Sequence, residues 1–116
     1  MTAILRGLVL ALCLVAPVSV QAERDGDATA AAQDFLATAD EYHQHAANVR
    51  AALSSLPPHA RADAQRLIGV LQQLAQVKEQ MADAIVAHGW DKQLERRYDQ
   101  LKEQEQRLWQ AVEAAK

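Results

Sequence analysis

The residues best suited to chemistry lie in the stretch DEYHQHAANVR, residues 40–50. Side chains two positions apart on a helix point to nearly opposite sides, so His43 and His45 cannot bind one ion together. Glu41 and His45 are four positions apart and share a face, which allows a two-ligand metal clip. Because zinc sites usually need three or four ligands, such a clip would need further ligands from a second chain. The simpler interpretation is a solvated helix face.

Other residue combinations do not predict an enzyme. Ser54, Ser55 and His59 are neighbours in sequence, but no acidic residue or oxyanion-hole loop accompanies them. The single cysteine, Cys13, lies in an apolar N-terminal stretch. No glycine-rich loop could hold a phosphate. We therefore expect a non-enzymatic protein without a cofactor.

Residues 1–22 have the pattern of a secretory signal peptide. Arg6 precedes an apolar run over residues 7–16, and Val20 and Ala22 occupy the positions of small residues before a cleavage site. The run is too short to span a hydrocarbon layer of roughly 30 Å as a helix. The pattern predicts export, most simply to a bacterial periplasm, cleavage after Ala22, and a mature protein that does not span a membrane.

The charge of the chain restricts its partners. Twelve basic and 15 acidic residues give a formal net charge of −3. Removal of residues 1–22 would delete one basic residue and no acidic one, so the mature chain would be more acidic. This balance argues against nucleic acid as a partner. We expect a protein partner or a homo-oligomer instead.

The rest of the chain predicts an all-α fold with a flexible lead at residues 23–27, Asp27 as an N-cap, and one domain at 28–116. Apolar residues spaced alternately by three and four predict helices near 28–56, 58–88 and 91–116. In the second helix Ile68, Val70, Ala75, Val77, Ala82 and Val86 widen the apolar surface, which predicts the central position. The positions that recur at this spacing form one stripe on each helix, which we call its seam. The three seams are Ala28, Ala32, Phe35, Ala39, Tyr42, Ala46, Val49, Leu53 and Leu56; Ala60, Ala64, Leu67, Leu71, Leu74, Lys78, Met81 and Ile85; and Leu94, Tyr98, Leu101, Glu105, Leu108, Val112 and Ala115.

The ends of the helices are indicated by residues next to each connection. Pro57 disfavours helical geometry at Leu56, while Pro58 fits a first helical turn. Gly89 is a typical helix stop and Asp91 a typical N-cap. Such short connections predict three long antiparallel helices, arranged as a coiled-coil-like bundle or as an elongated helical hairpin with a third helix.

Two polar features of the helices suggest further roles. Lys78 and Glu105 are charged residues at seam positions that are otherwise apolar. Either the charged ends of their side chains reach solvent, or the two residues form an ion pair that fixes the helix register. The outer stripe of the second helix is polar with little charge, and its Gly69 would let another backbone approach closely. This candidate interaction face comprises Gln65, Gly69, Gln72, Gln76 and Gln80.

In layout, the mature chain resembles the small periplasmic helical stress chaperones of the Spy and CpxP kind. Their Leu-Thr-x-x-Gln motifs are missing here, because Thr2, Thr29 and Thr38 do not follow a leucine. The resemblance implies a chaperone-like or binding role and transfers no residues. We expect a non-enzymatic exported protein that acts through an interaction surface, as a chaperone-like protein, an adaptor or a self-associating protein. The alternative is a metal-binding or metal-sensing periplasmic protein that uses Glu41 and His45.

Overall fold

A computed structural model describes the backbone of residues 12–115 and the side chains of residues 26–115. Helix α1 spans Leu12–Ala52, and a short 3-10 helix, η1, follows at Leu53–Ser55. Helix α2 spans Pro58–Ala87 and helix α3 spans Lys92–Ala115. Within this described part every element is helical, which confirms the predicted all-α class.

The N-terminal part of the fold differs from the sequence prediction. The expected flexible lead at residues 23–27 is a continuous part of α1, so Asp27 is not an N-cap. Helix propagation is cooperative, and one internal glycine costs only about 1 kcal/mol relative to alanine, so Gly26 does not end the helix. The proposed cleavage point after Ala22 falls inside α1, and the first half of the predicted signal lies outside the described residues. Among the described helices, none contains the length of apolar sequence that a membrane span requires.

The helix ends follow the local signals closely. Leu56 is extended, with φ −88° and ψ 148°, and Pro58 begins α2. At the other end of α2, Gly89 adopts φ 99° and its N–H donates to the carbonyl oxygen of Ala84 at 3.0 Å. The carboxylate of Asp91 then accepts hydrogen bonds from the backbone N–H groups of Gln93 and Leu94, which caps α3.

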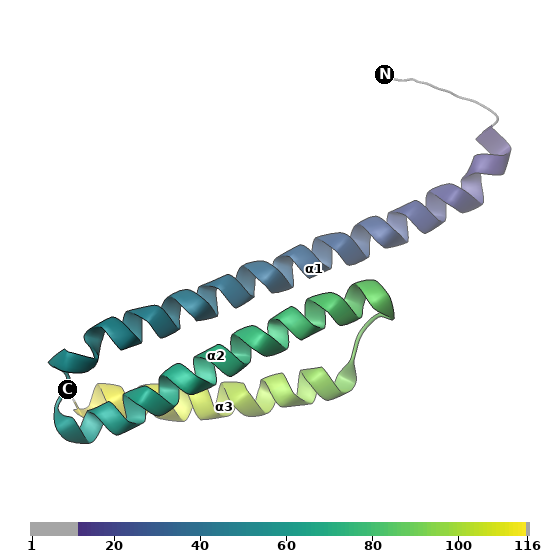
Figure 1. The fold of residues 1–116 in the computed structure, drawn as a ribbon. Helices are drawn as coiled ribbons and strands as arrows, with labels where there is room; N and C mark the ends of the chain where they lie inside the picture. Colours follow the sequence, from purple (N-terminus) through teal and green to yellow (C-terminus); the bar gives the residue numbers. More distant parts are fainter. Residues whose placement is uncertain (1–11, 116) are drawn as a thin grey trace.

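Helix α2 lies between the other two, as its wide apolar surface predicted (Figure 1). Lower-numbered residues of α1 contact higher-numbered residues in α2 and in the turn after it. His43 contacts Glu79 of α2, and the ring of Phe35 lies 6.1 Å from that of Trp90 in the turn. Among the described residues, the backbones of α1 and α3 do not approach each other closely, and the two helices contact each other only through side chains. The molecule measures 70 × 29 × 17 Å, and α1 extends past the turn joining α2 and α3 (Figure 1).

The core follows the three predicted seams. Leu67, Leu71 and Leu74 of α2 have no exposed surface, because both neighbouring helices cover them. Burying a leucine fully contributes roughly 1.5–3 kcal/mol relative to leaving it exposed. Val86 departs from the prediction: 61% of it is exposed. It is the second-last residue of α2.

Candidate functional site

The predicted interaction face of α2 lies on the surface. Gln65, Gln72, Gln76 and Gln80 are exposed, and Gly69 is partly exposed among them. These residues lie opposite the leucines that form the core of α2. Within the part of the chain that the structure describes, the polar face of the central helix is therefore uncovered, although both flanks of this helix are packed.

A groove follows this face on the side of α3. It has a volume of about 530 Å³. Val70 and Leu108 contribute apolar lining, and each of the two helices contributes one arginine, Arg66 from α2 and Arg107 from α3. It is lined by Arg66, Gly69, Val70 and Gln73 of α2 and by Gln104, Arg107 and Leu108 of α3. The groove offers apolar contact and positive charge together, which suits an apolar group carrying a carboxylate.

Gly69 leaves this groove open without being required by the fold. A methyl group added there would meet no atom within 4 Å, and its backbone is ordinary α-helix. We expect Gly69→Ala to raise the free energy of unfolding by about 1 kcal/mol, the difference in helix propensity. Chemical denaturation monitored by circular dichroism measures this change. A loss of stability would show that the glycine is needed for packing within the monomer.

The candidate metal clip, Glu41 and His45, lies on the exposed surface of α1. Within the part of the chain that the structure describes, no group of three or more histidine, cysteine or acidic side chains converges on one point. The two residues could supply at most part of a coordination sphere, and the remaining ligands would have to come from another molecule.

His43, rather than His45, links two helices. Its Nε2 atom lies 3.5 Å from the Glu79 carboxylate on α2, and both side chains are about half exposed. An exposed pair of this kind contributes roughly 0–1 kcal/mol, so it marks the register of α1 against α2 more than it holds the two helices together.

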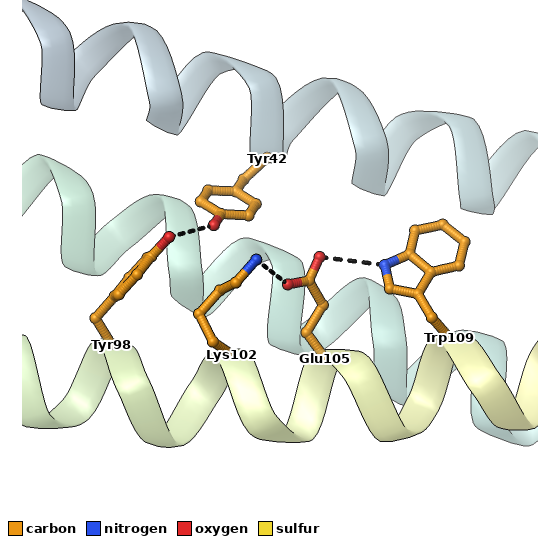
Figure 2. Close-up of polar contacts among 5 residues, drawn as sticks. All are labelled: Tyr42, Tyr98, Lys102, Glu105 and Trp109. Carbon is orange, nitrogen blue, oxygen red and sulfur yellow. Dashed lines mark hydrogen bonds and ion pairs between the residues drawn. The ribbon is translucent and has the colours of Figure 1, made fainter.

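A polar cluster joins the facing sides of α1 and α3 (Figure 2). Glu105 is buried, and its carboxylate accepts hydrogen bonds from Lys102 Nζ at 2.8 Å and from Trp109 Nε1 at 3.1 Å. A Lys78–Glu105 register pair, one of the two interpretations drawn from the sequence, is therefore wrong. Lys102 and Trp109 lie one turn to either side of Glu105 on the same helix, so they reach its carboxylate without crossing the core.

Lys78 is held by aromatic rings instead. Its Nζ atom lies 4.2 Å from the ring centre of Tyr98 and 5.0 Å from that of Phe35, both within the range of cation–π attraction. Burial lowers the pKa of Lys78, and the positive charge of Lys102 lowers this pKa further. The lysine thus links all three helices through ring faces.

Two tyrosines complete the cluster. The hydroxyl groups of Tyr42 on α1 and Tyr98 on α3 lie 2.6 Å apart and share a hydrogen bond (Figure 2). Burial raises the pKa of Tyr42 above its ordinary value, and the hydrogen bond with Tyr98 raises this pKa further. Neither tyrosine lines the α2–α3 groove. The arrangement of the cluster suits positioning of α3 against α1 better than catalysis.

Because of this tyrosine pair, we expect the free energy of unfolding to depend on pH. The unfolded chain ionises its tyrosines near pH 10, the ordinary value, whereas folded Tyr42 keeps its proton to higher pH. Ionisation therefore favours the unfolded state, and stability falls as the pH rises above 10. Lys78, whose pKa is lowered, changes stability in the opposite direction as the pH rises toward 10.5. We expect Tyr42→Phe to weaken the alkaline loss and to cost about 0.5–1.5 kcal/mol at neutral pH.

Denaturation at several pH values tests this expectation, with Tyr98→Phe and the double variant completing a cycle. The protein has two tyrosines, so ultraviolet titration reads this pair alone. Equal alkaline slopes for the wild type and Tyr42→Phe would contradict the assignment of the slope to Tyr42.

No protein-family model matches the chain, and no curated protein and no solved structure shows significant similarity to it. The resemblance to the small helical stress chaperones is thus one of layout alone. Over residues 12–115, the structure defines the class of an all-α protein with three long helices.

Sequence reasoning missed the groove and most of the polar cluster. The partners of Glu105 could have been found, because Lys102 and Trp109 are three and four positions away on one helix. Arg66 and Arg107 could not have been paired across the groove, because their proximity depends on how α3 lies against α2.

Proposed function

We propose that this protein is non-enzymatic and works by binding another protein through the outer face of α2 and the adjoining groove. One observation carries the proposal: the central helix of the fold leaves a polar, nearly uncharged face exposed beside a groove with apolar lining. Interfaces combine an apolar centre with a polar rim, and arginine is enriched in them. The groove with Arg66 and Arg107 has this composition.

We propose further that the protein is exported and acts in a bacterial periplasm after cleavage following Ala22. The support comes from the sequence pattern of residues 1–22. Cell fractionation followed by intact-mass measurement tests this proposal. The expected mature protein begins at Glu23, and a cytoplasmic protein that retains Met1 to Ala22 would contradict it.

Photo-cross-linking in cells tests the interaction face. A photoreactive residue at Gln72 or Gln76 of the full chain is expected to give a discrete cross-linked species, because both positions lie in the middle of the face. The matched control is the same residue at Asp99, an exposed position of α3. Equal cross-linking from all three positions, or none from α2, would contradict the proposal.

The metal alternative rests on Glu41 and His45 being exposed and one helical turn apart. Under the binding proposal, we expect zinc titration followed by calorimetry to show no stoichiometric site, and His45→Ala to change stability by less than about 0.5 kcal/mol. Zinc binding that disappears in His45→Ala would favour the metal alternative. His59→Ala, another exposed histidine substitution, serves as the control.

A further inference from the structure

The largest exposed apolar side chains in the described part of the chain lie near the turn that joins α2 and α3. Leu36 of α1, Val86 of α2 and Trp90 in the following turn are 46%, 61% and 51% exposed. Leu36 lies seven residues before His43, and Val86 lies seven residues after Glu79. Because His43 and Glu79 are in contact, and seven residues make two helical turns, Leu36 and Val86 lie side by side on the same outer surface.

The groove and this apolar pair lie on opposite flanks of the exposed face of α2. Val86 follows Glu79 on the flank of α1, whereas Arg66, Val70 and Gln73 line the groove on the flank of α3. Along the axis of α2, Val86 and Gly69 are about 25 Å apart at 1.5 Å per residue. A two-fold axis near Gln76 would therefore exchange the two features, so that the apolar pair of each copy meets the groove of the other.

The charges of the two surfaces that would meet are also opposite in sign. The chain from Asp27 to Val49 carries four carboxylates, those of Asp27, Asp34, Asp40 and Glu41, and no lysine or arginine. Asp40 lies one turn after Leu36 on the same exposed side of α1. The groove carries Arg66 and Arg107, of which Arg66 has an exposed ion pair with Asp63.

The exposed face is also large enough for a stable dimer interface. From Arg66 to Val86 the face is about 30 Å long at 1.5 Å per residue. The molecule is 29 Å wide. Such a face can bury roughly 800 Å² per partner, which is the size of a standard stable interface.

We propose that the protein forms a two-fold symmetric dimer in which the Leu36–Val86 pair of each copy fills the α2–α3 groove of the other, with Asp40 facing the arginines. The inference rests on the proposed function, because it names the partner of the same face as a second copy. Each interface contact occurs twice, as an isologous dimer requires. The polar glutamines of α2 form the centre around the axis.

A charge-exchange experiment tests the dimer. Wild-type protein, purified from cells that express the full chain, is expected to sediment as a dimer at low ionic strength. Arg107→Glu and Asp40→Arg each place like charges together and are expected to weaken the dimer at least tenfold. The combined variant restores opposite charges and is expected to recover most of the affinity. Asp99→Arg, on an exposed position of α3, is the matched control and should remain dimeric.

Leu36→Lys supplies a second, independent test, because it places a positive charge beside Arg66 and Arg107 of the other copy only when the dimer forms. This variant is expected to weaken the dimer at least tenfold. Circular dichroism of every variant shows whether the fold is retained. A monomeric wild type, or a combined variant no tighter than either single one, would overturn the dimer. If Gln72 still cross-links to a different protein in that case, the interaction face stands and only the identity of its partner is wrong.

Discussion

Leu71→Ala is expected to remove about 2–5 kcal/mol from the free energy of unfolding, the usual cost of truncating a fully buried leucine. Leu71 lies in the middle of α2 and has no exposed surface. Since α1 and α3 both pack on α2, the cavity would be bordered by all three helices, and no single helix could move to fill it. Small domains have only about 5–15 kcal/mol of stability, so the loss would be a large part of the total.

Chemical denaturation gives the free energy directly, and calorimetry gives the accompanying fall in melting temperature. Gln72→Ala, at the next position of the same helix, is the control because its side chain is exposed. It should change stability by less than about 0.5 kcal/mol. Similar losses for the two variants would mean that α2 is not the central helix of the core.

Glu105→Ala is expected to cost about 1–3 kcal/mol, because the buried carboxylate accepts two hydrogen bonds whose donors would lose their partner. The loss stays below that of a fully buried ion pair, since the side chain of Lys102 is 36% exposed and can regain water. Glu105→Gln keeps an acceptor for Trp109 and should lose less. Denaturation monitored by tryptophan fluorescence also reports the changed surroundings of the Trp109 indole.

Glu103→Ala provides the matched control, as it removes an exposed carboxylate from the same helix. We expect a change within about 0.5 kcal/mol. Adding salt should reduce the difference between Glu105→Ala and the wild type only in part, because the hydrogen bond from Trp109 is not screened. If the two carboxylate variants were equally stable, the polar cluster would have no structural role.

Much of the fold could be predicted because its signals are local. The prolines at 57 and 58, Gly89 and Asp91 set the helix ends through backbone geometry and capping, which neighbouring residues decide by themselves. The spacing of apolar residues identified which side of each helix is buried. The prediction of a flexible lead at residues 23–27 was wrong because helix formation is cooperative. The helical residues on both sides outweighed the local tendency of this segment to break the helix.

Most of the candidate sites depend on contacts between helices, which sequence spacing does not reveal. The exposed glutamine face of α2 follows from periodicity, so the sequence alone identified it. The α2–α3 groove, the pairing of His43 with Glu79 and the rings around Lys78 require residues far apart in sequence to meet.

The sequence alone was sufficient to predict the three long helices seen in residues 12–115, the ends of α2 and α3, and most positions of the core. Those properties depend on spacing within a helix and on residues next to each break. The tertiary structure decided that Glu105 pairs with Lys102, that Val86 is exposed, and that Arg66 and Arg107 border one groove. These properties depend on the relative rotation and register of neighbouring helices, since a shift of one turn leaves every local pattern unchanged while it replaces every contact between helices.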